Sequence, residues 1–228
     1  MALAVDGWSM NPQNTAILIP SLWRAKALER VIKNIRATTP EQHAIYSVVD
    51  EGDPASQAVC QKYGVRYWTD NAGYFVPRIQ FLFEKTDEPF FFTGSDDIIH
   101  SPGWLSGCFA VMEEHHKICC PNDGHNPKGT NFLVEREYVL QRGGNFETPG
   151  YVYHPGYLHN FSDDEMVSTG IFRGVYVRAM DVVVESTHPT WGNAPMDDTY
   201  MRMYVADDAD RALYYSRWHL WGSRDLWR

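Results

Sequence analysis

The chain lacks the features that mark several classes of protein. Its formal net charge of −9 over 228 residues argues against a broad surface for nucleic acid or anionic lipid, because phosphate groups attract Lys and Arg. The four cysteines include no Cys-x-x-Cys pair, which favours reduced thiols. No stretch approaches the roughly 18 apolar residues of a membrane span, and no signal peptide is apparent. We therefore expect a cytoplasmic protein without a membrane span.

Apolar and aromatic residues are abundant. At 44% apolar and 14% aromatic, the chain can bury a sizeable core, and its length fits one α/β domain. The 13 Tyr and 8 Trp exceed what a core usually needs. Their flat rings with a polar handle suit a sugar or a base, and extra packing under loops is the alternative.

Strands and helices alternate over the first half of the chain. Apolar runs predict strands at 15–21, 43–53, 65–69 and 89–94. Helical patterns follow them, the first at Leu28–Ile35 and the others at 54–64, 77–86 and 103–117. This alternation predicts βαβ units and a mostly parallel sheet flanked by helices.

The alternation stops near residue 120. Gly, Pro and Asn predict loops at 121–131 and 142–160, followed by one strand at 179–187. The stretch 196–222 predicts one or two amphipathic helices.

Carboxylates follow two of the predicted strands. Asp50, Glu51 and Asp53 end the second strand, and Asp96 and Asp97 follow the fourth in "FFFTGSDDIIHSPGW". Ligands of such sheets bind beyond the carboxyl ends of the strands, and Mg²⁺ prefers carboxylate oxygens. One acidic pair alone favours a surface turn. Two acidic strand ends favour a metal or sugar-phosphate site.

Four segments carry a resemblance to a known family. "AILIPSLWRAKALERVIKNI", "VVDEGD", "FFFTGSDDIIHSPGWL" and "HNFSDDEM" resemble nucleotide-sugar glycosyltransferases of GT-A fold, in the family 2-like branch that includes small bacterial and phage enzymes. The resemblance covers about residues 15–200. It implies a Rossmann-like α/β fold with a loop- and helix-rich acceptor region, in one domain, 1–228. The nucleotide-binding half is expected at about 1–120 and the acceptor-binding half at about 121–228.

The resemblance assigns residues to the donor, a nucleoside-diphosphate sugar with UDP favoured. Pro20 and Ser21 end the first strand as in the family, and Arg24 is the basic residue soon after. Asp50 stands where the family binds the nucleoside. Arg78 stands where the family places a basic residue beside the phosphates, and a solvent-facing helix position is its alternative.

A metal site is implied in the same way. Ser95-Asp96-Asp97 stands where the family has Asp-x-Asp, so Asp97 is the expected ligand of Mn²⁺ or Mg²⁺ and Asp96 is expected near the ribose or a metal-bound water. Ser95 replaces the first carboxylate, which reduces the expected metal affinity. His188 matches a further metal ligand of the family, with a structural role as its alternative.

The segment "HNFSDDEM" resembles the part of the family that carries the catalytic base. Asp163 is the first candidate to deprotonate an acceptor hydroxyl in an inverting transfer, and Asp164 is the second. A structural alternative is that these acids begin a helix capped by Ser162, where negative charge suits the helix dipole. The stereochemistry is also open, because an enzyme that retains the anomeric configuration would not need this base. Asp197 and Asp198 are expected to cap a later helix, with a role as base or in contact with the acceptor as the alternative.

Other functions and several acceptors stay open at this point. A nucleotidyltransferase is disfavoured because no glycine follows the first strand, in "PSLWRAKALER". A carbohydrate- or nucleotide-binding module without turnover is the other alternative. The acceptor of a transferase could be a saccharide, a lipid-linked sugar, a protein side chain or a modified nucleobase, and a homodimer is also left open.

Overall fold

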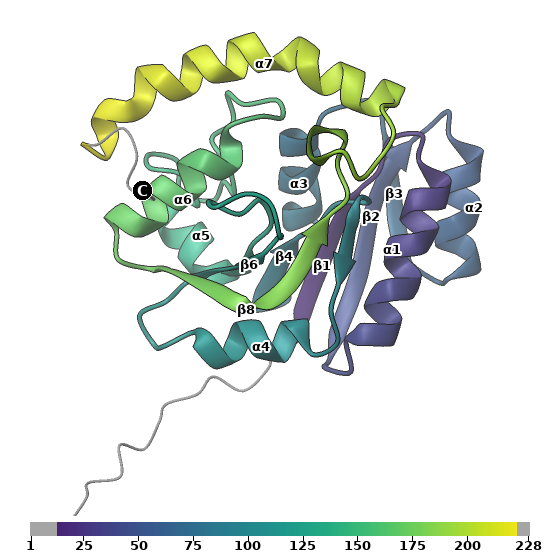
Figure 1. Cartoon of the computed structure of the whole chain (residues 1–228), viewed down its shortest axis with the longest axis horizontal. Coiled ribbons are helices and arrows are strands. Elements are labelled where there is room, and N and C mark those ends of the chain that lie inside the picture. Colours follow the sequence, from purple (N-terminus) through teal and green to yellow (C-terminus); the bar gives the residue numbers. More distant parts are fainter. Residues whose placement is uncertain (1–12, 223–228) are drawn as a thin grey trace, which may run out of the picture.

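A single sheet runs through the part of the chain that the computed structural model describes, residues 13–222 (Figure 1). Its eight strands follow the order β3-β2-β1-β4-β7-β6-β8-β5. The strands are β1 Thr15–Pro20, β2 His43–Asp50, β3 Arg66–Asp70, β4 Phe90–Thr93, β5 Ile98–His100, β6 Ile118–Asn122, β7 Leu133–Glu135 and β8 Tyr176–Ser186.

Parallel pairing dominates this sheet. The pairs β3-β2, β2-β1, β1-β4 and β6-β8 are parallel, whereas β7 is antiparallel to both its neighbours and β5 to β8. The predicted α/β class with a mostly parallel sheet and flanking helices is confirmed. The helices are α1 Ala25–Thr38, α2 Pro54–Lys62, α3 Phe75–Glu84, α4 Trp104–Val111, α5 Arg136–Arg142, α6 Ser162–Phe172 and α7 Asp198–Arg217.

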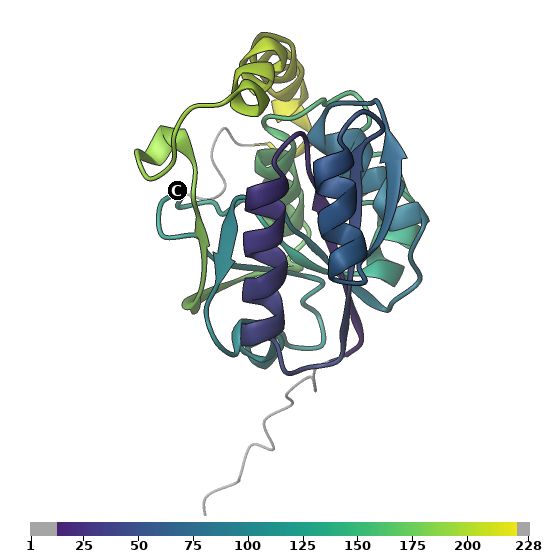
Figure 2. The same ribbon diagram turned by 90° about the vertical axis from the view of Figure 1, so that its right-hand side faces the viewer.

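Two hydrophobic cores cover the two faces of the sheet. Along β1, Ala16 and Leu18 belong to one core and Ile17 and Ile19 to the other, and all four are fully buried. Helices α3, α5 and α6 pack on the first face, and α1, α2 and α4 on the second, where α1 and α2 lie side by side (Figure 2). Burial on both faces explains why the strand is a continuous apolar run without polar alternation.

Several elements differ from the sequence prediction. The helix expected at 103–117 ends at Val111, because Met112 is extended at φ −80° and ψ 117°. Strands β5, β6 and β7 and helix α5 were not predicted, since three to seven residues are too short to show a periodicity. The predicted strand at 179–187 extends back to Tyr176. The C-terminal pattern forms one long helix, α7, followed by a short 3₁₀ turn.

Helix α7 crosses the top of the molecule in Figure 1 and is joined to α6 by a buried ion pair. Arg217 donates from Nε and Nη2 to the two carboxylate oxygens of Glu165, at 2.8 and 2.7 Å. The Tyr157 hydroxyl donates to the same carboxylate at 2.8 Å. Glu165 is 1% exposed, so its carboxylate has no water as an alternative partner, whereas Arg217, 7% exposed, also pairs with Glu147 at the surface.

Removing Arg217 should therefore destabilise the fold strongly. We expect Arg217→Ala to lower the free energy of unfolding by about 3–5 kcal/mol, because it leaves the buried Glu165 carboxylate without its counter-charge. Lys62→Ala removes an exposed ion pair to Glu29 instead and should leave stability nearly unchanged. Urea titration of the two variants measures the difference. Equal midpoints would show that the buried pair does not hold α7 in place.

A second contact from α7 positions the loop before α6. The Asp210 carboxylate, 1% exposed, accepts hydrogen bonds from the backbone N–H groups of Leu158, His159 and Asn160 at 2.8–2.9 Å. Backbone donors to a buried carboxylate make strong, directional contacts. The position of His159 is thus fixed by a residue 51 positions later in the chain.

Candidate active site

Two adjoining cavities lie beyond the carboxyl ends of β1 and β4, beside the start of α7. The first, here called the arginine pocket, has a volume of about 610 Å³ with the open space at its mouth included, and is lined by Arg24, Arg78 and Arg202 among others. The second, the aspartate groove, has a volume of about 1140 Å³ measured in the same way and is lined by four carboxylates. These are Asp97, Asp163, Asp164 and Asp207.

The predicted site residues divide between the two cavities. Asp163 and Asp164 line the aspartate groove, and Asp50 lies behind the pocket wall rather than in it. Six residues line both cavities and so mark their junction: Phe75, Ser95, Asp97, His159, His188 and Met203. The other predicted residues line the arginine pocket: Pro20, Ser21, Arg24, Arg78 and Asp96. The two residues predicted to bind the metal therefore meet at the junction.

Asp96 is buried and already engaged by the protein. Its oxygens accept hydrogen bonds from Ser21 Oγ at 2.6 Å and from Arg24 Nη1 at 2.7 Å, and the residue is 4% exposed. Burial raises the pKa of Asp96 to about 6, although the Arg24 charge lowers it. The side chain thus fixes Ser21 and Arg24 at the end of β1.

Asp97 is held from three directions. Its backbone oxygen accepts from the N–H and the hydroxyl of Thr187 at 2.7 and 2.6 Å, which ties it to the end of β8. Ser95 Oγ donates to its Oδ1, and the Tyr200 hydroxyl lies 3.0 Å from Oδ2. Ser95, which replaces the expected carboxylate, therefore orients Asp97 in this arrangement.

Tyr200 is a central residue that sequence reasoning missed. Its hydroxyl accepts from Arg24 Nη2 at 2.6 Å, and the Arg24 guanidinium lies 4.4 Å from the ring centroid. The His188 ring packs edge-on against the same ring at 4.5 Å. In the sequence Tyr200 is one aromatic among several in an amphipathic helix. Asp197, which accepts from the backbone N–H of Tyr200 at 3.1 Å, caps α7 as predicted.

One ring nitrogen of His188 is already engaged by the protein. Burial lowers the pKa of His188, although the Asp97 charge raises it. Its Nδ1 accepts from the backbone N–H of Thr190 at 3.2 Å, so the neutral ring carries its proton on Nε2. His188 can bind a metal ion through Nε2 only if its proton moves to Nδ1 and the contact to Thr190 is given up.

Arg78 joins two strand ends. Its Nη2 lies 3.1 Å from Asp50 Oδ2 and 2.7 Å from Asp70 Oδ1, while its Nη1 donates to the Ser21 carbonyl oxygen at 2.9 Å. Arg78 is 2% exposed, so the alternative of a solvent-facing position is wrong. Asp70 was missed by sequence reasoning, although it ends β3 directly opposite Asp50. Burial raises the pKa of Asp50, and Arg78 lowers it.

Helix α6 presents Asp163 to the groove. The helix does begin at the predicted acids, but Phe161 rather than Ser162 stands at its N-cap, and Ser162 Oγ donates to the His159 carbonyl oxygen at 3.2 Å. Asp164 is ion-paired with Lys128. Burial raises the pKa of Asp163 to about 7, and the adjacent Asp164 carboxylate raises it as well. Asp163 is thus the better placed of the two to take up a proton near neutral pH.

Two strained backbone positions flank these residues. Trp23 and Phe161 have φ values of 57° and 61°, and they are the non-glycine residues with positive φ in the described chain. Trp23 precedes Arg24, and Phe161 lies two residues before Asp163. Bulky residues adopt this conformation only where the surroundings enforce it, which often happens beside functional groups.

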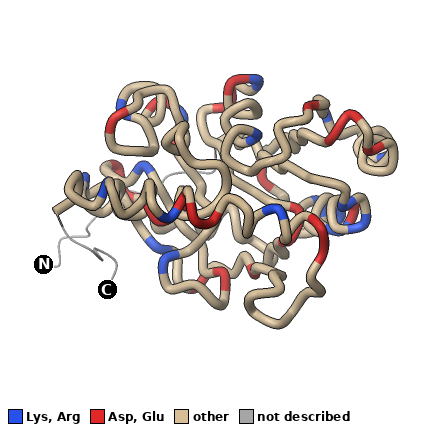
Figure 3. The backbone as a smooth tube through the Cα atoms, turned by 90° about the horizontal axis from the view of Figure 1, so that it is seen from above, with Lys and Arg blue, Asp and Glu red and all other residues tan. Residues whose placement is uncertain are grey.

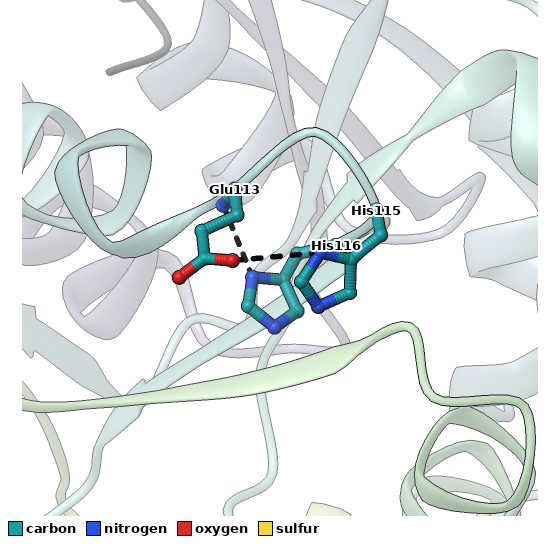
Figure 4. Close-up of side chains that lie close together, drawn as sticks. All are labelled: Glu113, His115 and His116. Atoms are coloured by element: carbon teal, nitrogen blue, oxygen red, sulfur yellow. Dashed lines mark hydrogen bonds and ion pairs between the residues drawn. The ribbon is translucent and has the colours of Figure 1, made fainter. Parts of the chain in front are cut away.

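A separate group of ligand-type side chains lies on the surface. Glu113, His115 and His116 follow α4, and their donor atoms lie within 4.8 Å of one another (Figure 4). His115 Nδ1 lies 3.5 Å from Glu113 Oε2, and His116 Nδ1 accepts from the Glu113 backbone N–H at 3.0 Å. These contacts within the turn account for the cluster, which lines neither cavity.

Seen from above in Figure 3, acidic and basic segments are interspersed over the described chain.

Comparison with known proteins agrees with this architecture. The mannosyltransferase PcManGT from Pyrobaculum calidifontis, in complex with GDP-Man and Mn²⁺, superposes with a TM-score of 0.64 at 11% identity, over 93% of this chain and 68% of that one. Glucosyl-3-phosphoglycerate synthase from Mycobacterium tuberculosis, in complex with Mn²⁺, UDP and glucosyl-3-phosphoglycerate, gives 0.62 at 11% identity, over 90% and 80%. Mannosyl-3-phosphoglycerate synthase from Rubrobacter xylanophilus gives 0.62 at 12% identity, over 90% and 75%.

These likenesses define the class as the GT-A fold of glycosyltransferases. The family model described as glycosyl transferase family 2 matches residues 16–181, so the chain belongs to that family and is a glycosyltransferase. No curated protein matches the chain. Within residues 13–222, none of the helices has the length and apolar character needed to cross a membrane.

Proposed function

We propose that the chain transfers a sugar from a nucleoside-diphosphate sugar to an acceptor hydroxyl, with a divalent metal ion and with inversion at the anomeric carbon. The observation that carries this proposal is the position of Asp97 between a pocket with arginines and a groove with Asp163. The diphosphate would lie on one side of Asp97 and the acceptor on the other. The sugar to be transferred would then sit at the junction.

The donor set at the junction fits a hard metal ion with few protein ligands. Asp97 offers a fixed carboxylate, and His188 offers a second ligand if it releases Thr190. Mn²⁺ or Mg²⁺ bound this way would complete its coordination with phosphate oxygens and water, as such ions commonly do. The ion would supply Lewis-acid neutralisation of charge on the departing phosphate. The neighbours' complexes with Mn²⁺ and with UDP or GDP-Man support this assignment.

The arginine pocket would hold the nucleotide, for which we favour UDP. Asp50, which lies behind the pocket wall, would act on the nucleoside side of the pocket by holding Arg78 in place, and Pro20 and Ser21 would border the nucleotide. Arg24, fixed by Asp96 and Tyr200, would face the diphosphate. Because the protein already holds these side chains, the donor site would need little rearrangement on binding.

Asp163 would act as the general base. The acceptor oxygen forms a bond to the anomeric carbon while the bond from that carbon to the diphosphate oxygen breaks, and the electron pair leaves with the nucleoside diphosphate. The hydroxyl proton passes to Asp163, whose raised pKa makes it a suitable proton acceptor near neutral pH. Asp164 is the second candidate, and its ion pair with Lys128 makes it less available.

Thermal unfolding with nucleoside diphosphates tests the donor site. We expect UDP with Mn²⁺ to stabilise the protein by about 2.7 kcal/mol at a 100-fold excess over Kd. For a chain of this size, that corresponds to a rise in Tm of about 5–10 °C. Uridine with Mn²⁺, and Mn²⁺ alone, serve as controls and should give smaller rises. If neither UDP nor GDP raises Tm in the presence of Mn²⁺, the proposed donor site is wrong.

A further inference from the structure

The acceptor side of the site has its own chemistry, which differs from that of the donor side. Resting on the proposed transfer, we propose that the acceptor is a neutral saccharide, bound in the aspartate groove with one sugar ring against Trp191. The observations that carry this are the acidic lining of the groove, its uncharged polar side chains and a fixed aromatic ring in its wall.

The charged side chains that line the groove are acidic. Four aspartates line it, and the described residues that line it include no Lys or Arg. Two of these aspartates, Asp164 and Asp207, are ion-paired with Lys128 and Arg211. A phosphorylated or carboxylated acceptor would meet like charges here and would have to compete with the aspartates for these two cations.

The arginine pocket shows the contrast. It is lined by Arg24, Arg78 and Arg202 as well as by Asp96 and Asp97, so it offers a diphosphate the guanidinium groups that the groove lining lacks. One structural neighbour, glucosyl-3-phosphoglycerate synthase, has been solved with phosphoglyceric acid, an anion. The acidic lining of the groove in this chain favours a neutral acceptor instead.

Trp191 provides a fixed ring in the groove wall. Trp191 is the last residue of the 3₁₀ turn Pro189–Trp191, which begins directly after His188, and its side chain remains 39% exposed. His125 stacks on it at 5.2 Å and 11°, and Asn193 lies 3.2 Å from His125 Nε2. A ring supported on one side offers its exposed surface to a flat apolar ligand at little cost in conformational entropy. The C–H face of a sugar ring is such a surface.

Uncharged polar groups complete the wall. Thr130, Asn131, Asn160 and Thr190 line the groove, and hydroxyl and amide groups can both donate to and accept from sugar hydroxyls. Asn131 is 7% exposed and donates to the Thr93 carbonyl oxygen at 2.7 Å, so its position is set by β4. This combination of a ring with neutral polar groups is what a neutral saccharide requires.

Acceptor competition tests the inference. Release of nucleoside diphosphate is followed with a UDP- or GDP-sugar and Mn²⁺, first without acceptor and then with neutral glycosides, namely methyl glucoside, methyl mannoside and their disaccharides. 3-Phosphoglycerate and methyl glucuronide serve as anionic acceptors. We expect at least one neutral glycoside to accelerate release at least tenfold over water and to yield the extended glycoside by mass spectrometry. The anionic acceptors should not accelerate it.

Two aromatic residues of equal exposure provide the matched variants. Trp191→Ala should raise KM for the neutral acceptor at least tenfold, while the Kd of UDP with Mn²⁺, from calorimetry, changes less than twofold. Tyr151→Ala, also 39% exposed and outside both cavities, should change neither quantity.

The outcomes separate the inference from the function on which it rests. Donor turnover that is accelerated by an anionic acceptor and not by neutral glycosides would overturn the inference and leave the transferase intact. The inference would also be overturned, with the transferase intact, if the donor is hydrolysed but no neutral glycoside accelerates release of the nucleoside diphosphate. An acceptor KM that is unchanged in Trp191→Ala would have the same consequence. Absence of both donor binding and donor hydrolysis would overturn the proposed function itself and the inference with it.

Discussion

Replacing Asp97 with Asn is expected to lower kcat/KM for sugar transfer by about 10²–10³-fold, which corresponds to about 3–4 kcal/mol of transition-state stabilisation. Asp97 is the carboxylate common to both cavities, and contacts to Ser95, Tyr200 and Thr187 hold it in place. An amide in its place keeps the size of the side chain and removes the charge that would bind the metal ion. Mn²⁺ should then no longer tighten the binding of UDP.

Calorimetry of UDP with and without Mn²⁺ measures this loss directly. Asp198→Asn serves as the matched control, because Asp198 begins α7 close to Tyr200 in the chain but is exposed and lines neither cavity. If Mn²⁺ tightens UDP binding equally in the wild type and in Asp97→Asn, Asp97 is not the metal ligand. His188→Ala should have the smaller effect of the two ligand variants, because its ring must first release Thr190.

Replacing Asp163 with Asn is expected to lower kcat by about 10²–10⁴-fold while leaving the Kd of UDP with Mn²⁺ nearly unchanged. The kcat falls because an amide cannot take up the proton of the acceptor hydroxyl. The Kd of UDP is unaffected because Asp163 does not line the arginine pocket. Asp164→Asn tests the second candidate, and Asp208→Asn, exposed on α7, is the control for a lost surface charge. A larger loss from Asp164→Asn than from Asp163→Asn would move the base assignment to Asp164.

The pH dependence follows from the same residue. A base must be unprotonated, and burial raises the pKa of Asp163 to about 7, so kcat should rise with pH through about 7 and level off above it. Below pH 6 the carboxyl is mostly protonated and the rate should fall about tenfold for each pH unit. A flat profile between pH 5 and 8, with chemistry limiting the rate, would show that Asp163 is not the base.

The first half of the fold is readable from the sequence because its signals are local. Strands β1 and β4 are continuous apolar runs, and α1 and α3 each have a clear apolar face. The acids at the strand ends, Asp50 and Asp97, mark the edge where both cavities lie. The elements missed, β5, β6, β7 and α5, are short, and the three strands depend on tertiary pairing rather than on a repeating pattern.

The interior of the site was harder to predict for a similar reason. Tyr200 reaches Asp97 across 103 residues of sequence, and Arg217 reaches Glu165 across 52. Such contacts leave no spacing signal in a single sequence. Asp70 is the exception, since it ends a predicted strand beside Asp50 and could have been included in the donor site from the sheet order. Arg78 was selected by resemblance, and its burial between two carboxylates became visible only in three dimensions.

Release of nucleoside diphosphate from UDP- and GDP-sugars, measured with Mn²⁺ and again with excess EDTA, tests the central claim most directly. We predict release from at least one donor in Mn²⁺, a fall of at least about 10²-fold in EDTA, and a similar fall in Asp97→Asn. Release that is equal in Mn²⁺ and EDTA would contradict the metal-assisted mechanism. No release from any donor in Mn²⁺, with the protein folded, would contradict the transfer itself.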